Sequence, residues 1–391
     1  MTPLPDTFPP PLSSIVGDVS AAERRALAEL ATRSHEVITT HQHPGGAYPA
    51  SPTFSAYAGY AWLRDGAFTA EGVSRYGDVA SATRFHDWAN TVLALRRGKV
   101  NDLVAAAHRG EQPPNEAMLP TRFTLDGHDG SDPWWDFQTD GYGAWLWSAA
   151  AHARRHNLDL STWQSGINVA VDYLTMFWDR PCYDWWEEHV QHRHVSTLAA
   201  VYGGLRAAAD AGVLDPERTT QASGAADIIR ALVSGQGVAD GHLTKWLGSD
   251  AVDGSLPACI APFGLVDPTD PVALETLDAV SRDLDSDGGV YRYRADVFYG
   301  GGQWPLLSAL LGWNRAIQGD PAAALRHLRW VAAQATPNGQ LPEQVATHLL
   351  HPPSHAEWIK RWGSVATPLL WSHGMYLILA DELGLTHEAT P

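Results

Sequence analysis

The sequence predicts an all-α protein folded as one (α/α)6 barrel, and three observations favour this class. Apolar residues recur at helical spacing in segment after segment of the 391-residue chain. Alternating strand patterns are scarce, and Val290 to Tyr299 is the best short candidate. No linker rich in proline and serine divides the middle of the chain. Helices that follow one another without strands must pack on each other, and a ring of inner and outer helices buries them around one core.

Capping signals mark several of the predicted helices. Ser20 and Glu23 have the spacing of a capping box at the start of the first helix. Asp320 followed by Pro321 is an N-cap with a proline in the favoured first helical position. The last helix is expected over residues 367–384, from a threonine-proline pair to a glycine stop. The other helices are expected over residues 65–76, 79–97, 140–156, 161–178, 194–211, 216–234, 272–285 and 303–318.

The predicted helices form a single unit. We divide the chain into an N-terminal extension, residues 1–18, and one barrel domain, residues 19–391. An α-solenoid is the alternative helical architecture, but the sequence has no fixed repeat period to support it. Long loops rich in glycine, proline and tryptophan join the helices. In a barrel such loops gather at one end, where we expect them to build a cleft.

Composition restricts the partners and the location of the protein. The net charge of −17 argues against a nucleic-acid partner, because a phosphate backbone would repel this surface. No apolar run reaches about eighteen residues, so we expect no membrane-spanning helix. The first residues contain no basic region followed by an apolar one, so we expect no secretory signal and a cytoplasmic protein. Cys182 and Cys259 are too few for a disulfide framework. The sequence does not indicate an oligomeric state.

Tryptophan is unusually frequent, with 17 residues against 9 phenylalanines. Indole rings present flat apolar faces and one polar edge. Sugars also combine apolar C–H faces with polar edges, so tryptophan-rich loops suit a carbohydrate ligand. The alternative for each of these side chains is an ordinary core position.

Residues 183–189 combine carboxylates with aromatic side chains. Asp184, Glu187 and Glu188 flank a pair of tryptophans that includes Trp186. Burial beside apolar surface disfavours the charged form of a carboxyl group and raises its pKa. A raised pKa is what a general acid needs near neutral pH. The alternative is a solvated acidic pair at the start of a helix.

A second carboxylate, Glu343, follows turn residues and stands among apolar and amide neighbours. It could activate a water molecule as a general base, and its alternative is an ordinary surface glutamate. Glu187, Glu343 and one water molecule are the apparatus of an inverting glycosidase, which keeps its two carboxyl groups far enough apart for that water. Activity would then be bell-shaped in pH, with the acidic limb from Glu343 and the alkaline limb from Glu187.

Three further segments place aromatic side chains beside groups that donate and accept hydrogen bonds, as sugar hydroxyls require. They are residues 57–66, 132–142 and 291–304. The alternatives are an Arg–Asp capping pair for the first segment and ordinary loops with buried aromatics for the other two. The candidate residues in these segments are Tyr57, Trp62, Arg64, Asp65, Trp134 and Arg292.

Other motifs do not support a metal ion or a cofactor. The histidines of residues 189–194 match no standard zinc spacing. The glycines at 300–302 are not followed by the Lys-Ser or Lys-Thr pair of a phosphate loop. No G-x-S-x-G segment is present, so the chain has no nucleophile elbow of the serine-hydrolase type. We therefore expect neither a metal ion nor a cofactor.

In their order along an all-helical chain, these five segments resemble glycoside hydrolase family 15, the glucoamylase and glucodextranase family. The resemblance covers about residues 45–385 and implies an (α/α)6 barrel. It implies that Glu187 protonates the leaving oxygen as general acid and that Glu343 activates the water as general base. Asp184 would orient the acid or share the work of the base, because it lies at helical spacing from Glu187.

The resemblance also implies a sugar-binding surface. Arg64 and Asp65 would bind hydroxyls of the terminal glucose, while Trp134 would pack near the acid and Arg292 would bind sugar near the cleavage point. The family's binding tyrosine corresponds to Ala58 here, with Tyr57 and Tyr60 nearby, so the assignment of its role stays open. The substrate-binding candidates are Tyr57, Trp62, Arg64, Asp65, Trp134, Trp186, Glu188 and Arg292.

The function implied is an inverting, exo-acting α-glucoside hydrolase that releases β-glucose from the non-reducing end of short oligosaccharides, its small-molecule partner. We expect neither the β-sandwich nor the starch-binding domain of many family members, so isomaltose and isomalto-oligosaccharides are the first expected substrates. Malto-oligosaccharides and trehalose are the alternatives, because the leaving-group side of the cleft sets the linkage. Outside this class, a sugar epimerase of the same fold and a non-catalytic sugar-binding protein stay open.

Overall fold

The computed structural model describes residues 19–134 and 137–387, and the expected extension of residues 1–18 lies outside this part of the chain. The described residues form α-helices joined by long loops, with short 3-10 turns and three two-stranded antiparallel hairpins. Within these two ranges, every helix is either too short or too polar to span a membrane.

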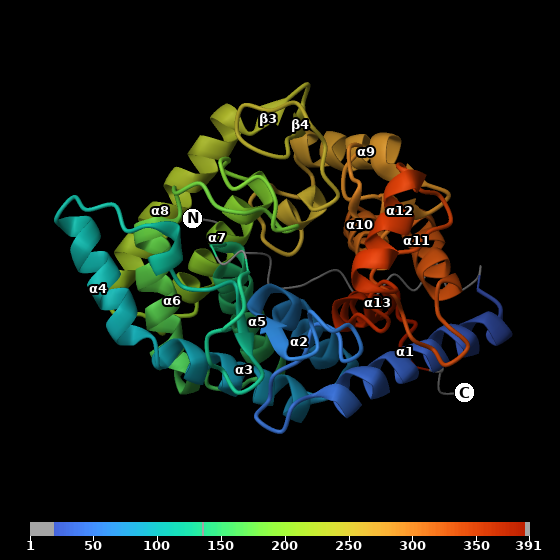
Figure 1. Ribbon diagram of the computed structural model, residues 1–391, viewed down its shortest axis with the longest axis horizontal. Coiled ribbons are helices and arrows are strands. Elements are labelled where there is room, and N and C mark those ends of the chain that lie inside the picture. The colour runs from blue at the N-terminus through green and yellow to red at the C-terminus, as the bar shows by residue number, and fades with distance from the viewer. Residues whose placement is uncertain (1–18, 135–136, 388–391) are drawn as a thin grey trace.

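Five α-helices and one short turn form an inner ring, near the centre of Figure 1. α13 packs against α2, α2 against α5, α5 against α7, and α10 against α13, while the 3-10 turn η4 contacts both α7 and α10. Most residues of these helices are buried, as is typical of helices that are enclosed on all sides. The bounds are Leu63–Tyr76 (α2), Asp140–His156 (α5), Val195–Asp210 (α7), Leu256–Cys259 (η4), Pro305–Ile317 (α10) and Leu370–Glu382 (α13).

Outer helices cover this ring. α1 packs on α13, α3 on α2, α6 on α3 and α5, α8 on α7, α9 on η4, and α11 on α10. The chain therefore alternates between the two layers, and each outer helix returns it so that the inner helices run in one direction. The bounds are Ala21–His41 (α1), Val79–Ala94 (α3), Gln164–Phe177 (α6), Pro216–Gln236 (α8), Pro271–Leu284 (α9) and Pro321–Ala333 (α11).

The predicted all-α class and (α/α)6 barrel are confirmed, with one inner position filled by the 3-10 turn η4 instead of a full helix. An α-solenoid is excluded, because α13 packs against α2 and closes the ring. Additional small elements lie in the connections between the barrel helices. They are α4 (Arg97–His108), α12 (Pro352–Trp362), the turns η2 (Asn115–Ala117), η3 (Leu160–Trp163) and η5 (Phe298–Gly300), and the strand pairs β1 (Tyr60–Trp62) with β2 (Arg122–Thr124), β3 (Val238–Ala239) with β4 (His242–Leu243), and β5 (Asp285–Ser286) with β6 (Gly289–Val290).

Close crossings between inner helices depend on glycine. A Cβ on Gly72 of α2 would lie 2.4 Å from the carbonyl oxygen of Gly374 in α13. A Cβ on Gly143 of α5 would lie 2.2 Å from the carbonyl oxygen of Ala200 in α7, and Gly204 of α7 is equally close to α5. Helix backbones approach this closely only where no side chain separates them, so these glycines set the width of the inner ring.

The predicted helices are present, with boundaries shifted by a few residues, but several details differ. The Ser20 hydroxyl accepts the expected hydrogen bond from the Glu23 amide, whereas the Glu23 carboxylate binds Arg329 of α11 instead of completing a capping box. The expected start of the last helix at residue 367 is wrong, because α13 begins at Leu370.

Two other predictions miss surface or loop elements. The strand expected from Val290 to Tyr299 is wrong: only its first residue belongs to a strand, and a loop and η5 follow. α4 and α12 were not predicted as separate helices; α4 buries only Val100 and Leu103, and α12 buries no residue completely. In α4 this weak apolar face gives little periodic signal. α12 is amphipathic and packs Trp358 on Phe298 and Tyr299, so its signal was present in the sequence and was overlooked.

We expect Gly143→Ala to lower the free energy of unfolding by about 1–3 kcal/mol, because the added methyl group would overlap the α7 backbone. The matched control is Gly224→Ala in α8, where a Cβ meets nothing within 4 Å. This exposed helical position should gain about 0.5–1 kcal/mol from the change. Denaturant unfolding measures both variants, and a Gly143→Ala protein as stable as the control would contradict the glycine crossing.

Candidate active site

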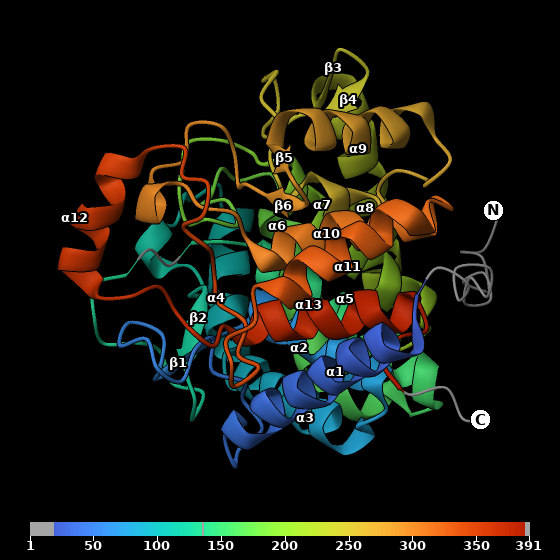
Figure 2. The same cartoon turned by 90° about the vertical axis from the view of Figure 1, so that its right-hand side faces the viewer.

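The site lies at the end of the barrel where the inner helices begin. Because these helices run in one direction, the loops that precede them meet at the same end. Figure 2 shows this end at the left, where α12 and the β1–β2 pair project beyond the helices. The loops before α2, α5, α7, α10 and α13 are the five segments that the sequence analysis singled out.

Glu187 receives hydrogen bonds from two indoles. Trp62 Nε1 donates to Oε1 and Trp134 Nε1 donates to Oε2, each over 2.6 Å. The side chain stays partly accessible, yet protein atoms surround its carboxyl group. Desolvation by burial raises the pKa of Glu187 to about 7, against the lowering effects of Arg64 and the two indole hydrogen bonds. The carboxyl group is therefore able to hold a proton near neutral pH.

Glu187 sits in a tight turn, not on a helix. Its amide donates to the carbonyl of Asp184, and the Asp184 amide donates to the carbonyl of Glu188. The Asp184 carboxylate oxygen Oδ1 accepts hydrogen bonds from the amides of Trp186 and Glu188, at 3.0 and 2.9 Å. Glu187 adopts a left-handed φ of 60°, which costs an L-residue about 1–2 kcal/mol and persists because these bonds fix the turn.

This turn corrects the prediction for Asp184. The spacing between Asp184 and Glu187 is that of a helix face, but the residues form a turn. Asp184 is 3% exposed and lies beneath the turn, with Oδ1 on the two amides and Oδ2 toward Lys245. Its carboxylate therefore caps the turn that carries Glu187.

Glu343 is 3% exposed and has one hydrogen-bond partner on its carboxyl group. The Tyr57 hydroxyl donates to Oε1 over 3.2 Å, while Oε2 is buried with no hydrogen-bond partner in the described part of the chain. Burial raises the pKa of Glu343 to about 8, opposed by the Tyr57 hydrogen bond and by Arg292. In the unliganded protein the pKa of Glu343 is therefore higher than the pKa of Glu187. An acidic limb from Glu343 requires the opposite order.

An aromatic wall connects the two glutamates. The Tyr57 ring, whose hydroxyl binds Glu343, lies 5.5 Å from the Trp62 ring, whose indole binds Glu187. The Trp134 ring meets Trp62 edge-on, with 6.0 Å between centroids. The structure therefore brings together two carboxyl groups that are 156 residues apart in the sequence (343 minus 187).

Arg64 and Asp65 occupy the first turn of α2 and are nearly buried. Arg64 Nη1 donates to Gln138 Oε1 over 2.8 Å and to Asp140 Oδ2 over 2.9 Å, and Nη2 lies 3.6 Å from Asp65 Oδ2. Burial raises the pKa of Asp65 to about 6, although Arg64 opposes the shift. Asp140 was missed as a partner, and its signal was an acid at the start of a predicted helix.

Polar atoms left without partners point to a polar ligand. Buried atoms with no hydrogen bond in the described residues include Arg64 Nε, Asp65 Oδ2, Glu343 Oε2 and Gln344 Nε2. Such atoms are rare in folded proteins, because each carries a desolvation cost. Other such atoms lie elsewhere in the barrel, but these four belong to candidate residues or their neighbours and can pair with the hydroxyl groups of a ligand.

Arg292 and Glu188 form the third side of the site. Arg292 Nη2 lies 3.4 Å from Glu188 Oε1, and Arg292 Nε donates to Asp296 Oδ2 over 2.8 Å. The Tyr293 hydroxyl donates a short hydrogen bond to Glu188 Oε2. Arg292 is 3% exposed, and the carboxylates of Asp296 and Glu188 compensate its charge.

The Trp186 indole points away from Glu187. Its Nε1 donates to both oxygens of Asp253, at 3.0 and 3.2 Å. Sequence reasoning missed Asp253 and also Lys245 and Tyr293. Lys245 and Asp253 are single polar residues in a loop without a local motif, whereas Tyr293 stands beside Arg292 in a segment already singled out. Only the fold places the three beside the turn.

One carboxylate cluster has the geometry of a metal site, but a lysine neutralises it. Asp184, Glu188 and His189 place ligand atoms within 4.8 Å of one another. The Lys245 ammonium lies 3.2 Å from Asp184 Oδ2 and occupies the cationic position that a metal would take. We therefore assign no metal ion to this cluster.

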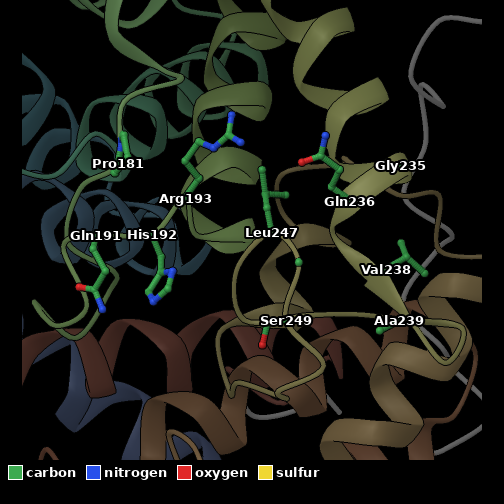
Figure 3. A pocket seen from close by; sticks show the side chains of 11 residues that line it. Pro181, Gln191, His192, Arg193, Gly235, Gln236, Val238, Ala239, Leu247 and Ser249 are labelled. Atoms are coloured by element: carbon green, nitrogen blue, oxygen red, sulfur yellow. The ribbon is translucent and has the colours of Figure 1, made fainter.

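A separate hollow lies beside the site. Figure 3 shows this cavity of about 610 Å³, which lies between the loop that carries His192, the end of α8 and the loop that carries Leu247. Its lining contains none of the candidate residues, and both Glu187 and Glu343 lie outside it.

Two buried carboxyl groups on one aromatic wall, with an arginine and an aspartate at the base, at the open end of a helical barrel, define a glycoside hydrolase. The chain belongs to the glycosyl hydrolases family 15, whose family model matches residues 25–350. This membership confirms the resemblance to the family and the enzyme class.

Similar proteins support the assignment over nearly the whole chain. An isomaltose glucohydrolase from Kribbella flavida is 71% identical over 368 residues, which are 94% of this chain and 96% of that protein. A trehalase from Mycolicibacterium smegmatis is 28% identical over 251 residues, 61% of this chain and 37% of that protein.

Solved structures agree with this result. A wild-type glycosidase has a TM-score of 0.92 and 70% identity and covers 94% of this chain and 99% of its own. A glycosidase variant with glutamate replaced by alanine, in complex with glucose, has a TM-score of 0.92 and 69% identity, with the same coverage of both chains. A bacterial glucoamylase complexed with acarbose shares the fold, with a TM-score of 0.73, 20% identity, and coverage of 90% of this chain and 55% of its own.

We expect kcat/KM for hydrolysis to be bell-shaped, with limbs near pH 7 and pH 8 set by Glu187 and Glu343. Trp134→Phe removes a hydrogen bond that stabilises charged Glu187, so the pKa of Glu187 should rise and the lower limb should move upward. Initial rates measured across the pH range test this, and a lower limb that stays in place or moves downward would contradict it.

Proposed function

We propose that this protein is an inverting, exo-acting isomaltose glucohydrolase that releases β-glucose from the non-reducing end of isomaltose and short isomalto-oligosaccharides. The observation that carries the proposal is the pair of buried carboxyl groups, Glu187 and Glu343, joined by one aromatic wall. The 71% identity to an isomaltose glucohydrolase over almost the full length of both chains supports the choice of substrate.

Glu187 is the general acid in this proposal. Protonated on one oxygen, it donates that proton to the glycosidic oxygen as the bond to the anomeric carbon breaks. The two indoles hold the carboxyl group in one orientation, because each of its oxygens accepts a hydrogen bond. Glucose then leaves from the face that carries Glu187.

Glu343 is the general base. Its Oε2 is free to accept a hydrogen bond from water, while Tyr57 holds Oε1. The carboxylate removes a proton from this water, whose oxygen attacks the anomeric carbon on the face opposite the leaving group. One displacement at an α-linkage inverts the configuration, so the product is β-glucose.

The required protonation states follow from ligand binding. Before binding, Glu343 has the higher pKa of the two, so the form with charged Glu343 and protonated Glu187 is the minor one. A hydrogen bond donated by the attacking water stabilises the charged form of Glu343 and lowers its pKa. The leaving glucose covers Glu187 and excludes solvent from it, which keeps its pKa raised.

Arg64 and Asp65 would hold the terminal glucose. Arg64 Nε and Asp65 Oδ2 have unused hydrogen-bonding capacity, and a sugar hydroxyl both donates and accepts. Both residues lie in the first turn of α2, on rigid helical backbone. Because Arg64 and Asp65 would bind the end of the oligosaccharide, attack is limited to its terminal linkage, which accounts for exo action.

The other classes have less support. An epimerase would need histidines beside the reacting carbon, but His192 stacks on Trp246 with 4.2 Å between centroids. A non-catalytic binding protein would not require two carboxyl groups with raised pKa values. No observation favours malto-oligosaccharides or trehalose over isomaltose.

We expect the protein to release glucose from isomaltose, with β-glucose as the first anomer to appear. Inversion at the α-linkage requires this anomer, and mutarotation follows more slowly. Proton NMR of the anomeric region during the first minutes separates the two anomers. α-Glucose as the first product would contradict inversion, and failure to release glucose from isomaltose would contradict the substrate.

The two carboxyl roles can be separated with α-glucosyl fluoride, because fluoride leaves as an anion without needing a proton. Glu187→Gln should lower kcat on isomaltose by orders of magnitude, on the scale of about 10²–10⁴ for a lost general acid, while it spares the fluoride substrate. Glu343→Gln should impair hydrolysis of both substrates, since both need an activated water. If the two variants show the same pattern, the assignment of roles is wrong.

A further inference from the structure

Lys245 is one of three lysines in the chain, and its ammonium is buried between carboxylates. Its Nζ lies 2.5 Å from Asp253 Oδ2 and 3.2 Å from Asp184 Oδ2, and the residue is 4% exposed. Burial lowers the pKa of Lys245, but Asp253 and Asp184 more than offset that effect and raise it overall. The side chain is therefore a fixed cation next to the turn that carries Glu187.

Three links run from Lys245 to residues 184–188. The first is the direct contact with Asp184, whose other oxygen caps the amides of the turn. The second passes through Asp253, which accepts hydrogen bonds from the Trp186 indole. The third passes through Tyr293, because the Lys245 ammonium lies 3.8 Å from the centre of its ring and its hydroxyl donates to Glu188.

Glu187 itself has no link to Lys245, but the residues on both sides of it do. Asp184, Trp186 and Glu188 each connect to Lys245 directly or through one partner, and Glu187 stands among them with its left-handed φ of 60°. A turn held at three of its side chains has little freedom to rotate. The direction of the Glu187 carboxyl group then depends on a charge that does not touch it.

The Lys245 backbone is held independently of its side chain. Its amide donates to the Ala251 carbonyl over 2.7 Å, and its carbonyl accepts from the amide of Val195, the first residue of α7, over 3.1 Å. The loop therefore stays attached to the barrel when the side chain changes. Removing the ammonium leaves two buried carboxylates, Asp184 and Asp253, facing each other without a cation.

We propose that Lys245 is a positioning residue that holds the turn of residues 184–188 so that Glu187 points at the leaving oxygen. It acts through Asp184, Asp253 and Tyr293 and contacts no reacting atom. This proposal rests on the proposed function, since it assigns a purpose to the orientation of the general acid. It predicts that loss of the ammonium affects the steps that need a proton from Glu187 and spares those that do not.

The test compares isomaltose and α-glucosyl fluoride with Lys245→Met, which keeps the length of the side chain and removes its charge. Misplacement of a catalytic group by about 1 Å can lower a rate about 100-fold, so we expect kcat on isomaltose to fall by about that factor. The rate on α-glucosyl fluoride should change little, because fluoride needs no acid. The matched control is Lys360→Met, an exposed lysine on α12, which should keep both rates.

Circular dichroism and thermal unfolding establish that each variant is folded. If Lys245→Met does not fold, Tyr293→Phe takes its place, because it removes only the hydroxyl that binds Glu188. This variant should show the same loss on isomaltose and the same retention on the fluoride, with a smaller effect.

The outcomes separate the two proposals. An equal loss of both rates would mean that Lys245 supports the whole site, and no loss on isomaltose would mean that it has no part in catalysis; either result overturns the positioning role. The proposed function is judged on the wild-type protein alone, which fails if it releases no β-glucose from isomaltose.

Discussion

The common direction of the inner helices is the constraint on which the site depends. Each outer helix returns the chain, so the loops that precede α2, α5, α7, α10 and α13 meet at one end. Close crossings at glycine, such as that of Gly143 in α5 against α7, keep the inner ring narrow. The two glutamates therefore lie at the same end of the barrel although they are far apart in the sequence. Fold and chemistry are connected here through burial, because desolvation among the loops at this end raises the pKa of both carboxyl groups.

Three buried cations at this end of the barrel each lie between two carboxylates. Arg64 lies between Asp140 and Asp65, and Arg292 lies between Asp296 and Glu188. Lys245 lies in the same way between Asp184 and Asp253. Glu187 and Glu343 are different, because their closest hydrogen bonds come from neutral indole and phenol groups. A neutral donor orients a carboxyl group without fixing it in the charged state, which leaves these two groups free to exchange protons. The arrangement separates groups that hold the site from groups that react.

Sequence reasoning predicted the features that have a local pattern. Helices with a clear cap were found, and Asp320 caps α11 as expected, whereas α12, an amphipathic helix that buries no residue completely, was missed. Glu187, Glu343, Arg64 and Trp134 were singled out because aromatic and charged residues stand together in short segments, and their functional roles stay predictions. Lys245 and Asp253 were not singled out, because they stand outside the five segments and only the closed ring places them beside residues 184–188. Tyr293 stands within a segment, but its contact with Glu188 cannot be read from the sequence. Asp184 was misplaced for a related reason: a spacing of three residues fits a helix and a turn equally well, and the hydrogen bonds of the turn decide.

The central claim is that Glu187 and Glu343 act from opposite faces of one glucosidic bond with room for a water molecule between them. A crystal structure of an inactive variant with bound isomaltose measures this most directly, through the distance between the two carboxyl groups and the contacts of each. The account predicts a separation of about 6.5–9.5 Å, with Glu187 on the glycosidic oxygen and Glu343 on a water below the anomeric carbon. A separation of about 5 Å, which leaves no room for that water, or a sugar bound away from either carboxyl group, would contradict it.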